Sequence, residues 1–235
     1  MFIALEGPDG GGKTTQAAIL AGRLERVGKT VVSVHEPGGT LLGAELRAIL
    51  VRRAGPPLKP WAEALLFSAC RAQLVAEVIR PALLDGYMVV ADRYADSTRA
   101  YQGSGRGLPR DRLEQLIEIA SGGLQPDLKL LLDLPAPDGL ARLGSERADV
   151  ERMPQEQLTF LEELQLPSGW NGFDELMGSF HERVRDAYRT LAAEDPLRWV
   201  VIDASQPIEE VADAIWTEVT RRLEAGIASG VDRSG

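Results

Sequence analysis

A glycine-rich stretch close to the start of the sequence is the clearest sign of chemistry. Gly7, four intervening residues and then Gly12-Lys13-Thr14 satisfy the Walker A spacing. Glycines let backbone N–H groups converge on phosphate oxygens, Lys13 can reach the outer phosphates, and the Thr14 hydroxyl can bind magnesium. The spacing therefore predicts a phosphate-binding loop, although switches, motors and kinases all use such a loop.

A carboxylate and a guanidinium follow an apolar run later in the chain. Asp92-Arg93-Tyr94 comes directly at the end of the run from Tyr87 to Asp92. At the end of a strand that faces the phosphate loop, Asp92 can hold magnesium or its water, and Arg93 can grip a phosphate with two hydrogen bonds. An ion pair at the strand end is the alternative interpretation.

An aromatic ring and a second guanidinium are predicted to share one helical face. Phe67 and Arg71 are four residues apart in a segment with helical spacing. A nucleobase needs a surface to stack on and donors for a ring oxygen, and this pair supplies both. Taken alone, the pair also fits a core phenylalanine beside a surface arginine. The two motifs described above favour a base pocket.

Short apolar runs and helix-spaced segments must hold these residues in place. The runs are rich in Val, Ile and Leu and too short for core helices, and they predict strands at Phe2 to Glu6, Thr30 to Glu36, Tyr87 to Asp92, Lys129 to Leu134 and Arg198 to Asp203. Helices are predicted at about 13–27, 41–53, 60–84, 109–121, 138–146, 173–193 and 208–224. Strands that alternate with helices imply an α/β fold with a parallel sheet covered on both faces.

A single domain over residues 1–226 accounts for this pattern. The tail at 227–235 has no apolar periodicity and is expected to be disordered. Residues 155–179 break the pattern, because they combine a helix, a turn containing Pro and Gly, and a second helix. We interpret them as an insertion, either a surface elaboration or a mobile flap that touches bound ligand.

Composition excludes several classes of protein. The 235 residues include 26 Lys and Arg against 35 Asp and Glu, a net charge of -9, so a broad cationic surface for nucleic acid or acidic lipid is not expected. Cys70 is the only cysteine, which excludes an internal disulfide and suits a reducing compartment. The sequence has no signal-peptide pattern and no apolar run near the ~20 residues of a membrane helix. It therefore predicts a cytoplasmic protein without a nucleic-acid or membrane partner.

Four motifs, in the same order, resemble those of bacterial thymidylate (dTMP) kinases. They are Glu6 to Gln16, His35 to Thr40, Leu65 to Gln73, and Asp92 to Gly103. The resemblance covers about residues 1–152 and resumes from Phe180 to the last helix. It implies a three-layer P-loop NTPase fold with a five-stranded parallel sheet flanked by helices and a mobile lid. It also implies ATP with Mg²⁺ as the phosphoryl donor, dTMP as the acceptor, and a homodimer.

The resemblance further implies roles for individual residues. Phe67 would stack on thymine, Arg71 would bond its O4, and Asp9 would face the 3′-hydroxyl or magnesium. Around them, Ser97, Thr98 and Gln102 would line the base pocket, Tyr101 would crowd the ribose 2′ position, Arg93 and Arg47 would bind the acceptor phosphate, and Glu36 and Pro37 would shape the same wall. The expected ATP-binding residues are Gly7, Asp9, Gly10, Gly11, Gly12, Lys13, Thr14 and Thr15, with Lys13, Asp92 and Arg93 in catalysis and Thr14 and Asp92 at the magnesium ion.

The lid is a further part of the resemblance. Members of the family supply catalytic arginines either from the P-loop or from the lid, and residues 7–15 contain no arginine. The lid type is therefore predicted, with a lid at about 138–156 and Arg142, Arg147 and Arg152 as candidates; a solvated basic helix face is the alternative for each. Two departures stand out: His35 precedes Glu36-Pro37 where arginine is common, and Glu151-Arg152-Met153-Pro154 replaces the usual Asp-Arg-Ile-Glu.

The acceptor implied by this resemblance needs no general base, because a phosphate monoester is already anionic near neutral pH. His35 and His181 are accordingly interpreted as surface or structural residues. Two alternatives remain open. A deoxynucleoside kinase would phosphorylate a hydroxyl, and Glu36 would have to be its base. A nucleotide-gated switch ATPase would leave Phe67 and Arg71 without a role.

Overall fold

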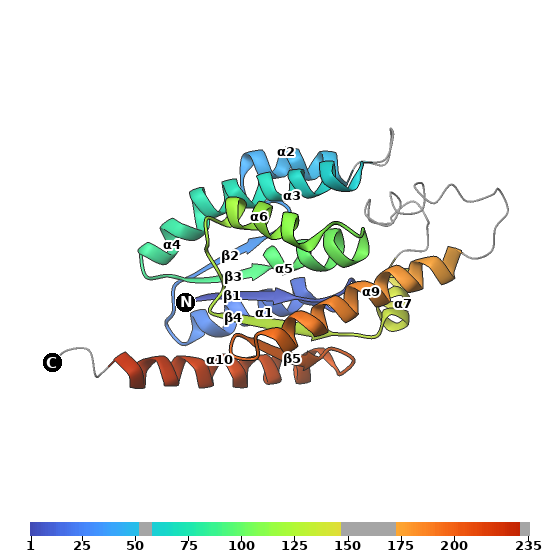
Figure 1. The fold of residues 1–235 in the computed structure, drawn as a ribbon. Coiled ribbons are helices and arrows are strands. Elements are labelled where there is room, and N and C mark those ends of the chain that lie inside the picture. Colours follow the sequence, from blue (N-terminus) through green and yellow to red (C-terminus); the bar gives the residue numbers. More distant parts are fainter. Residues whose placement is uncertain (52–57, 147–172, 231–235) are drawn as a thin grey trace.

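A computed structural model describes residues 1–51, 58–146 and 173–230 of the chain. Five parallel strands form one sheet in the order β2-β3-β1-β4-β5 (Figure 1). They are β1 (Phe2–Glu6), β2 (Val31–His35), β3 (Met88–Asp92), β4 (Leu128–Asp133) and β5 (Trp199–Asp203). The predicted α/β fold with a five-stranded parallel sheet is confirmed, and each strand lies where the apolar runs predicted it.

Helices cover both faces of the sheet (Figure 1). One face packs against α1 (Lys13–Arg26) and α10 (Ile208–Gly230). The other face packs against α3 (Pro60–Leu74), η1 (Val75–Ile79), α4 (Arg80–Leu84), α5 (Ala95–Thr98), η2 (Arg99–Gly105), α6 (Arg110–Ser121) and α9 (Phe173–Glu194). Helix α2 (Leu41–Leu50) lies against α3, and α7 (Ala136–Glu146) follows β4.

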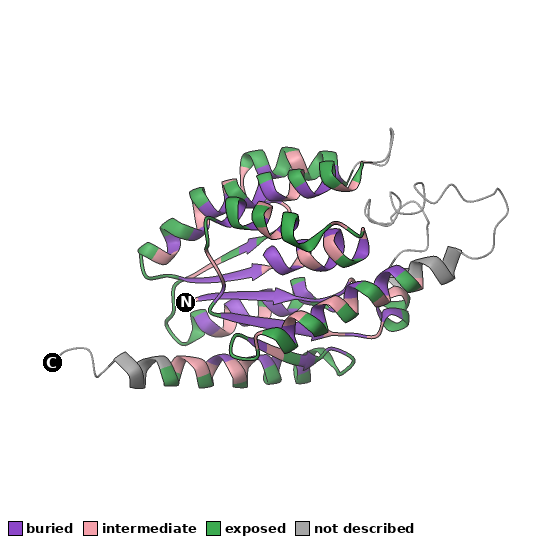
Figure 2. Ribbon diagram, viewed as in Figure 1, coloured by how far each residue is buried: buried purple, intermediate pink, exposed green. Residues whose placement is uncertain are grey.

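The alternation of side chains along β1 builds the two halves of the core. Ile3 and Leu5 pack with Leu20 of α1 and Ile215 of α10. Phe2 and Ala4 face the other way, into a second cluster formed with α3, η1, α4 and α6. Because successive side chains of a strand point to opposite faces, an apolar strand of five residues packs against the helices on both faces of the sheet. The three central strands β3, β1 and β4 are buried along most of their length, whereas the edge strands β2 and β5 are partly exposed (Figure 2).

Three segments differ from the prediction. The helix expected at 60–84 has a wider π-helical turn, η1, just before Pro81, whose missing N–H interrupts the regular hydrogen-bond ladder. Helices α5 and η2 were not predicted, since they are short and contain Gly103 and Gly105 instead of an apolar stripe. Helix α10 continues to Gly230, so part of the predicted disordered tail is helical.

The other predictions of a lid, an insertion and a disordered tail concern residues outside the described ranges. These are the second half of the predicted lid, residues 147–156, most of the predicted insertion, residues 155–172, and residues 231–235. No helix within 1–51, 58–146 and 173–230 is both long and apolar enough to cross a membrane.

Candidate active site

The predicted phosphate loop lies between β1 and α1, at the carboxyl edge of the sheet. Gly7 has a φ of 139°, and a Cβ atom there would lie 2.6 Å from the backbone oxygen of Leu132 in β4. Gly10 has a φ of 78° and packs directly against the backbone of Gly139 in α7. Both positions need glycine for conformation and for space. The loop is thus fixed against two neighbouring elements, with the N-terminus of α1 behind it.

Lys13, the first residue of α1, turns back over the loop. Its side chain is buried, and Nζ donates a hydrogen bond of 2.7 Å to the carbonyl of Pro8. Burial and repulsion from Arg93 lower the pKa of Lys13 to about 8, although Asp9 and Asp92 act in the opposite direction. A polyanion bound in the loop would favour the charged form of this amine.

Two oxygen atoms meet beside the loop, from Thr14 on α1 and Asp92 at the end of β3. The Thr14 hydroxyl donates to Asp92 Oδ2 at 2.5 Å. Among the described residues, no group of three or more His, Cys, Asp or Glu side chains could hold a metal ion. A hydroxyl and one carboxylate nevertheless suit Mg²⁺, which keeps several waters and takes its other ligands from substrate phosphates.

Arg93 connects the phosphate loop to the opposite side of the site. Its Nη1 donates to the carbonyl of Gly7 at 3.3 Å, and its Nη2 forms an ion pair with Asp9 and donates to Tyr101 Oη at 3.2 Å. Burial alone would raise the pKa of Asp9, but the charges of Arg93 and Lys13 hold that pKa below its ordinary value. Asp9, Arg93 and Tyr101, which the sequence placed near one another by resemblance, are therefore in direct contact.

Arg71 lies in the interior, one helical turn after the half-buried Phe67 on α3. Its side chain is 1% exposed, forms an ion pair of 2.7 Å with Glu36, and donates to Thr98 Oγ1 at 2.9 Å. The remaining nitrogen, Nη1, is buried and has no hydrogen-bond acceptor among the described residues. A buried guanidinium nitrogen without an acceptor is costly, so this atom marks a place where a ligand acceptor fits.

The side chain of Gln102 in η2 is hydrogen-bonded to Glu63, a residue that sequence reasoning did not single out. Gln102 Nε2 donates to Glu63 Oε1 at 2.7 Å, and Glu63 also pairs with Arg106 at 2.8 Å. Glu63 is buried and lies on α3, the helix that carries Phe67 and Arg71. With its amide N–H group engaged, Gln102 presents its carbonyl oxygen as the acceptor.

The wall formed by β2 and the loop after it carries the remaining predicted residues. Arg47 of α2 is exposed and donates to the carbonyl of Pro37 at 2.7 Å, so its guanidinium lies against this wall. His35, which stands where the family commonly has arginine, is exposed, and its ring packs on Gly38. Thr15 is exposed on the first turn of α1.

Of the three lid candidates, only Arg142 falls within the described residues. It lies on α7, and its Nη1 is 3.4 Å from the carbonyl of Gly10 in the phosphate loop. The prediction for Arg147 and Arg152 lies outside the described residues.

His181 is buried, and its ring lies edge-on to that of Phe180. Burial lowers the pKa of His181, although the negative charge of Asp9 acts in the opposite direction. It is therefore part of the interior.

Sequence reasoning also missed Glu6 and Tyr188. Glu6 ends β1 directly before the phosphate loop and is 0% exposed. The Tyr188 hydroxyl, from α9, donates to Glu6 Oε2 at 3.0 Å and lies 3.5 Å from Arg93 Nη1. A glutamate that ends an otherwise apolar strand is a local signal for Glu6. Tyr188 gives no such signal, since it is one apolar position in a long amphipathic helix.

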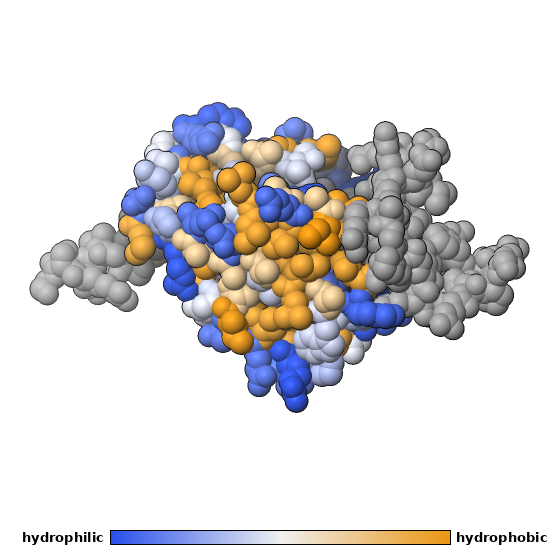
Figure 3. Space-filling model, turned by 90° about the horizontal axis from the view of Figure 1, so that it is seen from above, coloured by the Kyte–Doolittle hydropathy of each residue, from blue (hydrophilic) through white to orange (hydrophobic). Residues whose placement is uncertain are grey.

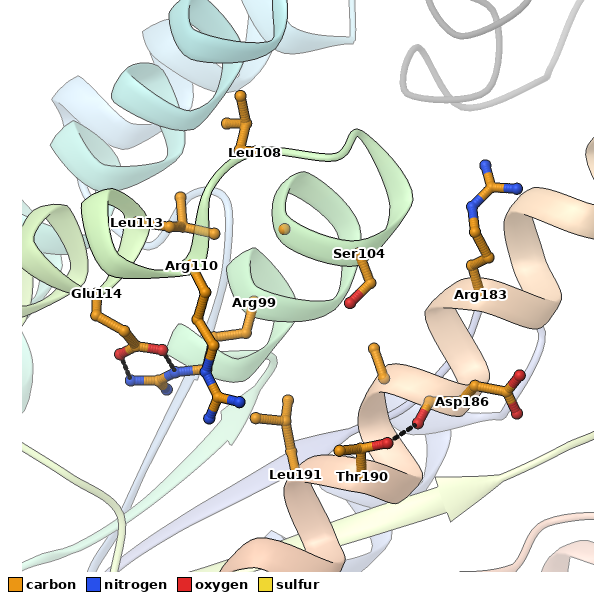
Figure 4. A pocket seen from close by; sticks show the side chains of 12 residues that line it. Arg99, Ser104, Leu108, Arg110, Leu113, Glu114, Arg183, Asp186, Thr190 and Leu191 are labelled. Atoms are coloured by element: carbon orange, nitrogen blue, oxygen red, sulfur yellow. Dashed lines mark hydrogen bonds and ion pairs between the residues drawn. The ribbon is translucent and has the colours of Figure 1, made fainter.

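A cavity of about 400 Å³ lies apart from these residues, between η2, α6 and α9 (Figure 4). Leucine side chains line part of it, and two of its three arginines form ion pairs: Arg99 with Glu114 at 2.6 Å and Arg110 with Glu194 at 2.5 Å. No predicted site residue in the described ranges lines this cavity. The predicted chemistry gathers instead at the carboxyl edge of the sheet, around Arg93.

Comparison with known proteins gives a consistent result. A family model described as thymidylate kinase matches residues 5–167. A thymidylate kinase of Thermomicrobium roseum is 47% identical over 225 residues, which cover 96% of this chain and 97% of that protein. A thymidylate kinase of Synechococcus sp. (strain JA-3-3Ab) is 47% identical over 229 residues, covering 97% and 98%. The crystal structure of a thymidylate kinase from Ehrlichia chaffeensis has a TM-score of 0.70 at 28% identity, covering 93% of this chain and 98% of that chain.

Proposed function

Because the chain belongs to the thymidylate kinase family, and so phosphorylates dTMP to dTDP with ATP, we propose that Arg93 lies between the two nucleotides and contacts both during phosphoryl transfer. This side chain donates to Gly7 of the phosphate loop and pairs with Asp9, and it lies next to Tyr101 on the acceptor side. A single guanidinium that touches both halves of the site is the observation that carries the proposal. It can bind the acceptor phosphate while it faces the donor phosphates.

ATP would bind with its phosphates in the loop of residues 7–15. Backbone N–H groups and the N-terminus of α1 would hold the phosphate chain, and Lys13 would reach its outer part. Thr14 and Asp92 would hold Mg²⁺ together with the nucleotide, and the ion would neutralise charge on the phosphate oxygens. Arg142, beside Gly10, would add charge from the lid side.

Thymine would bind between Phe67 and the pair formed by Arg71 and Gln102. Nη1 of Arg71 would donate to O4, and the carbonyl oxygen of Gln102 would accept the N3–H of the base. Cytosine presents the opposite pattern, with an acceptor at N3 and an amino donor at position 4. The fixed donor and acceptor would therefore select thymine, since each wrong base leaves buried polar groups unpaired.

The main obstacle to the reaction is repulsion between two polyanions. Two like charges at ~4 Å cost about 4 kcal/mol at an effective dielectric of 20. Lys13, Arg93 and the lid arginines would offset this repulsion and hold the attacking and leaving oxygens in line. The acceptor oxygen carries its own negative charge, so no side chain has to remove a proton.

An assay of ADP release with a panel of acceptors tests this assignment. With ATP and Mg²⁺, we expect dTMP to be turned over, and thymidine and dCMP to show kcat/KM values at least ~100-fold lower. Glu36, the base that a deoxynucleoside kinase would need, is buried and paired with Arg71, so it is not placed to accept a proton from thymidine. Phosphorylation of thymidine as efficient as that of dTMP would contradict the proposed acceptor site.

The enzyme would work as a homodimer, joined through the outer face of α2, α3 and α6. Hydrophobic side chains gather on this face (Figure 3). Leu65 on α3 is 55% exposed and Ile119 on α6 is 79% exposed, and Leu41, Leu42, Ile49 and Trp61 are exposed on α2 and α3. A contiguous apolar face of this kind is typical of a subunit interface.

The enzyme would be located in the cytoplasm. Its single cysteine, Cys70, is consistent with this reducing compartment.

The substitution Leu65→Glu tests the proposed interface. A charge at the centre of an apolar contact must be desolvated, so we expect the molar mass from light scattering to fall from that of a dimer to that of a monomer. Leu197→Glu is the matched control, because Leu197 is 82% exposed but lies before β5, away from this face. A wild-type chain that is monomeric at micromolar concentration, or a Leu65→Glu variant that stays dimeric, would count against this interface.

A further inference from the structure

A buried carboxylate lies directly behind Arg93. Glu6 is 0% exposed and accepts hydrogen bonds from three residues. The backbone N–H of Tyr94 donates to Oε1 at 2.8 Å, while the hydroxyls of Ser97 and Tyr188 donate to Oε2 at 2.7 Å and 3.0 Å. Of these three donors, the sequence predicted a substrate contact only for Ser97. The contacts of Glu6 therefore need a separate account.

The two hydroxyls that Glu6 accepts are also the ones that meet Arg93. Nη1 of Arg93 is 3.2 Å from Ser97 Oγ and 3.5 Å from Tyr188 Oη, and the two oxygens are 2.8 Å apart. Each hydroxyl has one hydrogen. When both hydrogens point to the ionised carboxylate, both oxygens turn their lone pairs toward the guanidinium. The charge of Glu6 thus sets the direction of two acceptors for Arg93.

The backbone of Arg93 is in an unusual conformation, and its side chain is held at both terminal guanidinium nitrogens. Its φ is 72°, in the left-handed region that residues other than glycine rarely adopt. The inner nitrogen, Nη1, is directed to Gly7, Ser97 and Tyr188, whereas Nη2 faces Asp9 and Tyr101. The contacts on Nη1 therefore fix which edge of the guanidinium faces the substrates.

We propose that Glu6 and Tyr188 are positioning residues for the acceptor phosphate, and that ionised Glu6 aligns the Ser97 and Tyr188 hydroxyls so that they hold Arg93. This inference rests on the proposed role of Arg93 in binding dTMP. Through Tyr188, helix α9 contributes a side chain to the site, although Tyr188 and Glu6 are 182 residues apart in the sequence. The position of α9, which follows the lid region in sequence, is thereby tied to the orientation of the arginine.

The arrangement also predicts a dependence on pH. Burial, and the negative charge of Asp96 on α5, raise the pKa of Glu6 to about 7, while Ser97, Arg93 and the N–H of Tyr94 oppose the shift. Lys13 on α1 and Tyr188 on α9 also face this carboxylate. Since the folded-state pKa is raised, Glu6 becomes protonated as the pH falls through 7. A protonated Glu6 no longer aligns both hydroxyls, so binding of dTMP should weaken below that pH.

The first test is Tyr188→Phe, which removes the hydroxyl and keeps the ring. At pH 8 we expect the KM for dTMP to rise about tenfold, with the KM for ATP within twofold of wild type. Tyr94→Phe is the matched control: it removes another tyrosine hydroxyl, which donates to the carbonyl of Leu124 at 3.1 Å, and should leave the KM for dTMP unchanged. An equal rise in both KM values for Tyr188→Phe would indicate general damage and overturn the proposal.

The second test uses Glu6→Gln across pH 6 to 8. The ratio of its dTMP KM to that of wild type cancels the ionisation of dTMP itself, and we expect this ratio to be about ten at pH 8 and close to one at pH 6. A ratio that does not change with pH would overturn the proposed alignment by ionised Glu6.

Arg93→Ala distinguishes the role proposed for Arg93 in binding dTMP from the positioning role proposed for Glu6 and Tyr188. If it leaves the KM for dTMP unchanged, the role proposed for Arg93 is wrong; if it raises this KM while Tyr188→Phe does not, only the positioning role is wrong.

Discussion

Lys13→Ala is expected to lower kcat by about 10³-fold, the largest effect of any substitution considered for this protein. The amine of Lys13 is buried, lies against the phosphate loop through Pro8, and shares the site with Arg93. If ATP binds in the phosphate loop as proposed, this amine would be the fixed counter-charge that α1 supplies to the transferred phosphoryl group. Steady-state kinetics with saturating ATP and dTMP measure the loss.

Lys29→Ala is the control for Lys13→Ala, because Lys29 is exposed beyond the end of α1. It changes the net charge equally and should leave kcat within twofold of wild type. Thermal unfolding of both variants shows whether a loss of activity reflects a loss of structure. Removal of Lys13 takes away a buried charge, so its unfolding temperature should not fall. Retention of more than a tenth of the wild-type kcat by Lys13→Ala would remove Lys13 from the proposed catalytic set.

The strands could be predicted from the sequence because each is a short apolar run, and the three central ones are buried on both faces of the sheet. Phe2 and Ile3 illustrate this, since both are buried although they point to opposite layers. The helical segment from Ala95 to Gly105 could not be predicted in this way. Its buried residues include Tyr101 and Gln102, which are held by contacts with other elements rather than by a local apolar stripe.

The predicted site residues share a local signal that the others lack. The loop up to Thr14 is recognisable because glycine, lysine and threonine have fixed spacing in one short stretch. Glu63 and Tyr188 act through partners 39 and 182 positions away, Gln102 and Glu6. Such pairs depend on which elements the sheet brings together. The sequence indicates which residues can do the chemistry, whereas the fold determines which residues hold them in place.

Arg71 is expected to be the principal determinant of dTMP binding through its base. Replacing it should raise the KM for dTMP about 10²-fold, because O4 of thymine would then face a buried site without a donor. The KM for ATP should stay within twofold, since the contacts of Arg71 are with Glu36 and Thr98 rather than with the phosphate loop. Initial rates with one substrate varied and the other saturating measure both values.

The design of this experiment depends on Glu36. Burial raises the pKa of Glu36, and the ion pair with Arg71 opposes that rise. Arg71→Ala alone would leave a buried carboxylate unpaired, which typically destabilises a protein by about 3–5 kcal/mol. The informative comparison is therefore Arg71→Met with Glu36→Gln, measured against Glu36→Gln alone. Both variants have a neutral residue at position 36, so their difference reports the guanidinium.

A sulfur analogue of the substrate, 4-thio-dTMP, separates binding of O4 from other effects of Arg71. Sulfur is a weaker acceptor than oxygen, so the analogue should have a higher KM than dTMP with Glu36→Gln. The same change should have no effect once Arg71 is replaced by Met, because the donor it weakens is gone. Such an interaction between a substitution in the protein and one in the substrate is the signature of direct contact. If the sulfur raises KM equally in both variants, Arg71 does not bind O4, and its buried Nη1 must be satisfied by something other than the base.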